Sequence, residues 1–483
     1  MAQSNEKDGD SIMDIRISKS DVLWNYIAQF FNLGSGLIVL PVVLSLLSPS
    51  EIGMNYLMLS VSSLVALADF GFSGQFGRNI TYVFSGAKEL KKEGIGTVKQ
   101  DCIDYHLLAV VIETAKYIYR KISLLAFIAM LTLGSLYMYK ATDGFTTVRN
   151  SLLIWILFSL SSYFNMYFMY YNSLLTGAAM IMEAKKVTIL NRIVYIFIAF
   201  VLLFIGCGLI SIVVANIISP FVGRWYSYKN FYRGNIKNAL QNEAVSTEEI
   251  KNMFKVLWYN AKKLGINFLG AYGIQQSGMF IIGLFLSLEE VASYGLMCQL
   301  FQVSSALSMG IFTTLLPAFY KYRAEGNIDR LIADFAFSIT VYFIAFTICG
   351  LGIMFIGSQL LDLIGSSTLL PVLSVVAIYF VHILLENFHS MCATMIVTNN
   401  EVPFVKAAIV SGVLIVLCNL VTLRFTSLGL LGVVLGQLFV QSLYNHWKWP
   451  FWIFQELHLN PIKLIRIGGQ GICNYIHMLR PKI

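Results

Sequence analysis

About twelve apolar stretches, each long enough to cross a membrane as a helix, fill this chain of 483 residues. A helix rises 1.5 Å per residue, so about 20 apolar residues span a hydrocarbon core of about 30 Å. The first half of the chain has such stretches at 23–47, 53–76, 122–139, 151–176, 188–205 and 208–226. The second half has them at 264–286, 292–319, 335–356, 371–397, 405–423 and 429–447. The sequence therefore predicts an all-α polytopic membrane protein.

The basic residues are distributed unevenly between the predicted connections. If the amino terminus is cytoplasmic, all but three of the 34 Lys and Arg lie in cytoplasmic segments or close to them. The exceptions are Lys140, Arg149 and Arg424. Cytoplasmic loops of membrane proteins carry such an excess of positive charge. We therefore predict that both termini are cytoplasmic and that the first span acts as an uncleaved signal anchor.

The composition excludes a water-soluble enzyme. Only 12% of the residues are charged and the mean hydropathy is +0.70, whereas soluble domains have about 25% charged residues. The net charge of +8 fits contact with anionic lipid, and no motif for nucleic-acid binding accompanies it. The sequence has no G-x-x-x-x-G-K-[ST], G-x-S-x-G or H-E-x-x-H motif, and its seven cysteines form no C-x-x-C pair. We predict no catalytic residue, no cofactor and no structural metal, with membrane lipids but no nucleic acid as partners.

The chain repeats itself. The segment with Ser48 and Glu51 returns 239 residues later as the segment with Ser287 and Glu290. Six spans in each half return the chain to its starting side, so the halves form two parallel six-helix bundles, an arrangement known in transporters. The predicted parts are a polar cytoplasmic tail (1–22), a six-helix bundle (23–226), a cytoplasmic linker (227–263), a second six-helix bundle (264–448) and an amphipathic cytoplasmic tail (449–483).

Polar side chains recur at helical spacing in the first and seventh spans, which are equivalent in the repeat. The eighth span carries two more. They are Asn25, Gln29 and Asn32, then Asn260, Lys263 and Asn267, and finally Gln299 and Gln302. Polar groups inside a bilayer are costly, so they line a cavity or pair with one another. We interpret the two matching stripes as the lining of a substrate cavity. For each single residue, an amide that joins neighbouring helices is an equal alternative.

Two charged residues near the cytoplasmic end of the second span are further candidates. Asp69 lies about two turns inside that end, and its counterpart in the repeat is Ser308. Asp69 could take up a coupling cation or proton, or it could pair with a basic residue such as Arg78; the sequence leaves both open. Arg78 could attract an anionic pyrophosphate head group or could simply anchor its helix at the lipid surface.

The span 371–397 places three ionisable groups on one face. His382, Glu386 and His389 are spaced four and three residues apart, as neighbours on a helix are. We interpret them as a pH-responsive cluster and as coupling candidates. A structural hydrogen-bond network is the close alternative. A metal site is the minority alternative, because the sequence shows three ligands and no fourth.

The helix at 25–47, the turn at 46–53 and the segment at 67–72 with Asp69 and Gly71 resemble the polysaccharide-transport members of the MOP exporter superfamily. These include the Wzx-type flippases of O-antigen and capsule repeat units. The resemblance implies a MATE-like, V-shaped pair of bundles around a central cavity in the inner membrane of a bacterium. It also implies an undecaprenyl-pyrophosphate-linked oligosaccharide as cargo, moved from the cytoplasmic to the outer leaflet by alternating access. A proton or sodium gradient would drive the cycle, and a polysaccharide polymerase and chain-length machinery would be partners.

Two other classes of function remain open. A multidrug cation antiporter of the same superfamily would share the fold, and reconstituted drug efflux would reveal it. A membrane-embedded glycan-modifying enzyme would rely on a residue such as His382 or His389.

Overall fold

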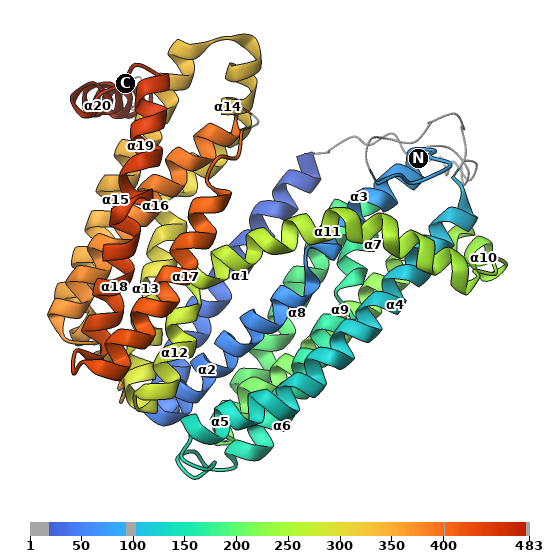
Figure 1. Cartoon of the computed structure of the whole chain (residues 1–483), viewed down its shortest axis with the longest axis horizontal. Helices are drawn as coiled ribbons and strands as arrows, with labels where there is room; N and C mark the ends of the chain where they lie inside the picture. The colour runs from blue at the N-terminus through green and yellow to red at the C-terminus, as the bar shows by residue number, and fades with distance from the viewer. Residues whose placement is uncertain (1–18, 93–102, 400, 480–483) are drawn as a thin grey trace. The chain divides into compact units, whose positions relative to one another are not determined.

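The computed structural model describes residues 19–92, 103–399 and 401–479, and the elements in these ranges are helices (Figure 1). The all-α prediction is therefore confirmed. The chain divides into two compact units. Unit 1 comprises Met58–Phe268 together with the chain up to Leu47, and unit 2 comprises Ser48–Leu57 and Leu269–Ile483.

Unit 1 is built from the helices of the first half of the chain and from most of a long helix that follows them. They are α1 (Lys19–Leu46), α2 (Pro49–Ala66), the 3₁₀ turn η1 (Leu67–Asp69), α3 (Phe72–Phe84), α4 (Tyr105–Ala129), the π turn η2 (Met130–Gly134), α5 (Ser135–Ala141), α6 (Ser151–Tyr167), α7 (Tyr170–Gly177), α8 (Ile181–Phe204), α9 (Ile210–Phe231), α10 (Asn235–Gln241) and α11 (Thr247–Gln275). Helix α8 packs against α1 and α9, and α6 packs against α4 and α9 (Figure 1).

Unit 2 contains the first half of α2, the end of α11 and the remaining helices. The remaining helices are α12 (Ser277–Phe285), α13 (Leu288–Ser308), α14 (Gly310–Glu325), α15 (Ile328–Leu363), α16 (Leu373–Val397), α17 (Val405–Phe425), α18 (Gly429–Leu443), α19 (Asn445–Glu456) and α20 (Pro461–Leu479). Helix α16 packs against both α18 and α19, while α15 packs against α13 and α14. The contacts of α16 with α18 and α19 position the main polar cluster of this unit.

The helices correspond to the predicted spans. Within the described ranges, seven helical segments are long and apolar enough to cross a membrane, and two bent pairs raise this number to nine. The other three predicted spans are occupied by α1, α9 and α18, which are helical over 28, 22 and 15 residues. The protein is therefore a multi-pass membrane protein, as predicted.

The repeated sequence motif forms the same local structure twice. The Glu51 carboxylate accepts hydrogen bonds from the backbone N–H and the hydroxyl of Ser48, at 3.0 and 2.9 Å. Glu290 does the same for Ser287, at 3.1 and 3.0 Å. Each serine in turn accepts the backbone N–H of its glutamate. This reciprocal capping box satisfies free N–H groups at a helix start. The repeat thus fixes where α2 and α13 begin.

A glycine allows these two helix starts to approach closely. A Cβ atom on Gly53 would lie 1.9 Å from the carbonyl oxygen of Leu288. No other residue type fits at this contact without moving one of the two helices.

Both halves interrupt the helix that follows the capping box, and they do so at the same place. In the first half, the left-handed residues Phe70 (φ 46°) and Gly71 (φ 79°) separate η1 from α3. In the second half, Met309 separates α13 from α14, which are bent by 44°. The offset of 239 residues carries Phe70 onto Met309. The repeat therefore extends from the helix start to the helix break.

Helices α10 and α20 lie wholly within segments that the sequence assigns to the linker and the tail. Helix α10 and the first turns of α11 occupy the predicted linker 227–263. In the predicted tail, α19 continues to Glu456 with Trp449 buried, and the amphipathic helix is α20. Helix α20 packs on α15 (Figure 1). Its Ile462 and Ile465 side chains are exposed.

Candidate functional site

Asp69 is buried in unit 1, at the break between η1 and α3. Its carboxylate accepts hydrogen bonds from the Tyr119 hydroxyl at 2.6 Å, the Ser73 hydroxyl at 2.9 Å and the Ser73 backbone N–H at 3.3 Å. The break places the acid at the amino terminus of α3, where the free N–H groups and the helix dipole stabilise a negative charge. The acid is therefore held by neutral donors and by the end of a helix.

The predicted alternative that Asp69 pairs with Arg78 does not describe this site. Within the described part of the chain, the hydrogen-bond partners of Asp69 are Ser73 and Tyr119. Arg78 is exposed and donates instead to the side-chain oxygen of Gln75, one turn away on α3. The two charges therefore act separately.

Aromatic side chains surround Asp69. The ring of Tyr119 lies 5.8 Å from that of Phe76 and 6.3 Å from that of Tyr170, measured between centroids. Phe72, next to the acid, stacks on Trp258 of α11 with centroids 5.9 Å apart. A carboxylate in such surroundings is shielded from water, which strengthens its remaining electrostatic interactions.

The structure describes some of the predicted cavity residues and not others. The side chains of Asn25, Gln29, Asn32, Lys263 and Asn267 lie outside the described part, although their backbones belong to α1 and α11. Their role in a cavity therefore stays a prediction.

The described cavity candidates have individual partners. Asn260 donates to the backbone carbonyl of Lys92 at 2.8 Å. Gln299 accepts a hydrogen bond from the Tyr56 hydroxyl at 2.6 Å, and Gln302 is exposed. Asn260 and Gln299 thus each join two segments of the chain, which agrees with the alternative that amides link helices.

The three groups predicted on the span 371–397 do lie together, on α16 of unit 2. The Nδ1 atom of His389 is 3.7 Å from Oε2 of Glu386, and His382 is buried one turn before Glu386. A fourth member, His446 of α19, places its Nε2 atom 3.4 Å from the same carboxylate oxygen. The ring of His446 lies 5.7 Å from that of His382 and 5.5 Å from that of His389. We call His382, Glu386, His389 and His446 the histidine cluster.

Amide groups from α18 and α19 support the histidine cluster. Gln441 donates to Oε2 of Glu386 at 2.9 Å and accepts from Asn445 at 2.6 Å. The Asn445 oxygen accepts the indole N–H of Trp449 at 3.0 Å. This chain of hydrogen bonds orients the carboxylate from behind, and every member of it is buried or partly buried.

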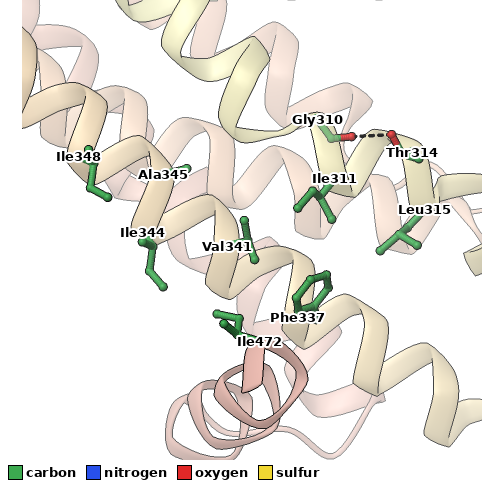
Figure 2. Close-up of a pocket in the computed structure, with 10 residues that line it drawn as sticks. All are labelled: Gly310, Ile311, Thr314, Leu315, Phe337, Val341, Ile344, Ala345, Ile348 and Ile472. Atoms are coloured by element: carbon green, nitrogen blue, oxygen red, sulfur yellow. Dashed lines mark hydrogen bonds between the residues drawn. The ribbon is translucent and has the colours of Figure 1, made fainter. Parts of the chain in front are cut away.

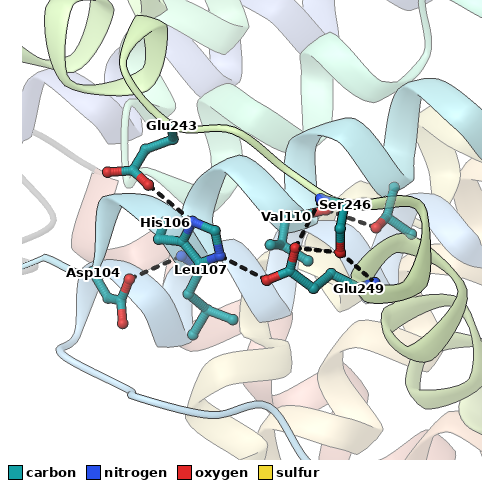
Figure 3. Close-up of polar contacts among 8 residues, drawn as sticks. Asp104, His106, Leu107, Val110, Glu243, Ser246 and Glu249 are labelled. Carbon is teal, nitrogen blue, oxygen red and sulfur yellow. Dashed lines mark hydrogen bonds and ion pairs between the residues drawn. The ribbon is translucent and has the colours of Figure 1, made fainter.

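A second histidine site, which the sequence pattern does not reveal, joins α4 to the first turn of α11 and to the segment before it. His106 places Nδ1 2.8 Å from Glu243 and Nε2 2.7 Å from Glu249 (Figure 3). Two carboxylates can both accept from one imidazole only when both ring nitrogens carry protons. Hydrogen bonds from His106 and Ser246 lower the pKa of Glu249 to about 2. No spacing rule links these residues, because 137 positions separate His106 from Glu243.

Unit 2 also has an apolar groove of about 630 Å³ along α14 and α15 (Figure 2). Its walls include Ile311 and Leu315 of α14, Val341 and Ile344 of α15, and Ile472 of α20. In Figure 2, the only hydrogen bond among the side chains drawn is the one that Thr314 donates to the Gly310 carbonyl, at 2.8 Å. A groove of this composition suits alkyl chains rather than a polar ligand.

Comparison with known proteins identifies the fold. No family model matches the sequence, and no curated protein sequence matches it. Among solved structures, an inward-facing multidrug resistance MATE family transporter of the MOP superfamily is similar with a TM-score of 0.61 and 14% identity, over 91% of this chain and 99% of that chain. The lipid II flippase MurJ in an inward closed conformation gives a TM-score of 0.59 and 12% identity, over 96% and 93%. The chain therefore has the same helical fold as these two structures.

An outward-facing structure of a multidrug resistance MATE family transporter is also similar, with a TM-score of 0.52 and 13% identity, over 92% of this chain and 97% of that chain. Two of these three structures are of MATE family transporters, and the third is of a lipid II flippase. The prediction of a MATE-like helical fold is thus confirmed.

Proposed function

We propose that this protein is a flippase that moves an undecaprenyl-pyrophosphate-linked oligosaccharide from the cytoplasmic to the outer leaflet of a bacterial inner membrane. The observation that carries the proposal is the fold shared with the lipid II flippase MurJ over 96% of the chain. Since that neighbour is a flippase of lipid II, we infer a lipid-linked cargo for this chain as well. The sequence motifs around Ser48 and Asp69, which resemble those of polysaccharide transporters, support the same class of cargo.

The physical mechanism of the proposal is alternating access. A sugar head group carries hydroxyls and a pyrophosphate that hydrocarbon does not solvate, so the protein has to supply polar partners along the path. Asn25, Gln29 and Asn32 on α1 are the proposed partners for the hydroxyls. Arg78 is exposed on α3 and offers a planar, bidentate group for a phosphate. The lipid tail stays in hydrocarbon while the head group crosses.

A proton or sodium gradient drives the cycle in this proposal. Asp69 is one uptake site for the proton or sodium ion. Its carboxylate is buried and accepts hydrogen bonds only from the neutral donors Ser73 and Tyr119 among the described residues. An arriving cation therefore compensates the negative charge without displacing a basic side chain. The histidine cluster is the other uptake site, with ionisable groups from two helices. Polysaccharide polymerase and chain-length machinery are the proposed partners outside the membrane lipids.

Deletion of the gene tests the proposed cargo. In the deletion strain we expect the lipid-linked repeat unit to accumulate in the cytoplasmic leaflet, with loss of surface polysaccharide. A plasmid copy should restore both. A triple variant with Asn25, Gln29 and Asn32 changed to Ala should fail to restore export at equal protein level. A normal amount of surface polysaccharide in the deletion strain would contradict the proposed cargo.

A MATE-type drug transporter is the second candidate function, because the TM-score to a multidrug resistance MATE family transporter is 0.61. Purified protein in vesicles with an imposed ion gradient separates the two candidates. Efflux of organic cations without any movement of lipid-linked oligosaccharide would favour the drug transporter.

A further inference from the structure

We propose that unit 2 contains a binding site for a divalent transition-metal ion of the zinc class, formed by His382 and Glu386 of α16 and His446 of α19. One ligand atom from each of these three residues lies within 4.8 Å of the others. The site does not depend on what the protein transports, since it rests on side chains within one unit. A metal ion bound here would occupy the histidine cluster, so that Asp69 alone would remain as the proposed uptake site.

The geometry is close to that of a bound zinc ion. Zinc binds imidazole nitrogen and carboxylate oxygen at about 2.0–2.2 Å in a tetrahedron, which sets its ligand atoms about 3.3 Å apart. The Nε2 atom of His446 is already 3.4 Å from Oε2 of Glu386. The ligand atom of His382 is at most 4.8 Å from the other two, so zinc binding requires it to move closer to them.

His389 or a water molecule completes the coordination. The Nδ1 atom of His389 is 3.7 Å from Oε2 of Glu386, on the same face of α16. In the sequence, three metal ligands stand on one helix with no fourth, which disfavours a metal site. His446 removes that objection, because it reaches the cluster from another helix, 60 residues after Glu386.

Unused hydrogen-bonding atoms point to a ligand at this place. The Nδ1 atoms of His382 and His389 are buried and have no hydrogen-bond partner within the described part of the chain. His382 is only 4% exposed. A buried polar atom without a partner is energetically costly, and coordination to a metal removes this cost.

The outer contacts are those expected around metal ligands. Ligating histidines bond through their second ring nitrogen, and ligating carboxylates are themselves hydrogen-bonded. The Nδ1 atom of His446 lies 3.2 Å from the Ser442 hydroxyl, which leaves Nε2 directed toward Glu386. Gln441 holds the carboxylate itself at 2.9 Å.

Ligand type and charge favour zinc over other common ions. Imidazole suits zinc and its neighbours in the first transition row, whereas Mg²⁺ and Ca²⁺ require oxygen ligands. Within the described residues, the ion pairs of Glu386 are to histidines and none is to Lys or Arg. A divalent cation would compensate this partly buried carboxylate inside a membrane-spanning unit, where an uncompensated charge is costly.

Metal binding to the intact, purified protein tests the proposal. Protein without its purification tag is stripped with a chelator, equilibrated with Zn²⁺, desalted and analysed by mass spectrometry of the elements. We expect about one zinc ion per chain. Co²⁺ in place of Zn²⁺ should give the intense visible absorption of a tetrahedral nitrogen and oxygen site.

Variants distinguish ligation from folding. His382→Ala and His446→Ala should each weaken zinc binding by more than the roughly tenfold to hundredfold loss expected for the outer-contact variant Gln441→Leu. His446→Cys replaces one zinc ligand by another, so it should bind zinc and give Co²⁺ a thiolate charge-transfer band. His458→Asn is the matched control, because His458 is exposed and its φ of 48° is one that Asn adopts readily.

Two results would overturn the proposal. One is wild-type protein that retains no zinc after desalting; the histidine cluster is then a hydrogen-bonded group that exchanges protons. The other is zinc binding that survives unchanged in His382→Ala and His446→Ala. Neither result bears on the cargo, because the assay requires no transport.

Discussion

At the scale of single residues, Asp69 has hydrogen-bond partners that its repeat counterpart, Ser308, lacks in the described part of the chain. The carboxylate of Asp69 accepts hydrogen bonds from Tyr119 and Ser73, whereas the hydroxyl of Ser308 is buried without a partner in the described part of the chain. The two halves therefore share a helix break but not the chemistry at that break.

Replacing Asp69 by Asn tests a role in coupling. The amide oxygen of Asn still accepts a hydrogen bond from Tyr119, but the negative charge is gone. A hydrogen bond to a charged group contributes about 1.5–3 kcal/mol. A loss of that size slows the transport rate by about 10-fold to 100-fold. We expect export of surface polysaccharide to fall by that order at equal protein level. Ser308→Ala, the matched change in the other half, should leave export unchanged. Wild-type export by Asp69→Asn would exclude Asp69 from coupling.

The His106 site predicts a stability that depends on pH. Its two contacts require a doubly protonated ring, so one of them is lost when the ring deprotonates at alkaline pH. Folding lowers the pKa of Glu249 from 4.5 to about 2, so its ionised carboxylate stabilises the fold above pH 4.5. This stabilisation disappears as the pH falls toward 2 and the carboxylate becomes protonated. We therefore expect the difference in Tm between wild type and His106→Gln to be larger near pH 6 than near pH 9. An equal difference at both pH values would contradict the doubly protonated ring.

At the scale of helices, the matched breaks at Gly71 and Gly310 predict opposite effects of one substitution. Gly71 has φ 79°, where an alanine costs about 1–2 kcal/mol. Gly310 begins a helix and has open space where a Cβ atom would stand, so alanine there gains about 0.5–1 kcal/mol. Thermal unfolding should show a lower Tm for Gly71→Ala and an equal or higher Tm for Gly310→Ala. A Tm change of the same sign in both variants would contradict the different backbone conformations assigned to Gly71 and Gly310.

The sequence predicted contacts along one helix better than contacts between helices. The spacing of His382, Glu386 and His389 placed them on one face because helical periodicity relates neighbours three and four residues apart. The partners Tyr119 of Asp69 and His446 of Glu386 are 50 and 60 residues distant, and only packing brings them into contact. Periodicity carries no information about such pairs, which is why the fourth member of the histidine cluster was missed.

At the scale of the whole molecule, the helix positions and the all-α membrane fold followed from apolar run length and charge distribution alone. Every one of the twelve predicted spans is occupied by a helix, because hydrocarbon requires each backbone polar group to be satisfied within its own segment. The boundaries differ most at α4, which begins at Tyr105 and not at 122, and at α11, which begins at Thr247 and not at 264. The first turns of both helices pack into the core of unit 1.

The predicted orientation in the membrane has a direct test. If both termini are cytoplasmic, a fluorescent protein fused at the carboxyl terminus should fluoresce. Alkaline phosphatase fused after Thr147, in the short connection between α5 and α6, should be active, since that connection is predicted to lie outside. A fusion after Gln241, in the linker, should be inactive and serves as the control. The reverse pattern would place the basic segments outside.

The twin capping boxes of α2 and α13 also bear on the origin of the gene. Two copies of a reciprocal Ser–Glu pair, each followed by a helix break at the same distance, are what an internal duplication of a six-span ancestor would leave behind. The acid at the helix break stands only in the first half, and the histidine cluster only in the second. The two descendants have thus kept a common framework while dividing the ionisable groups between them.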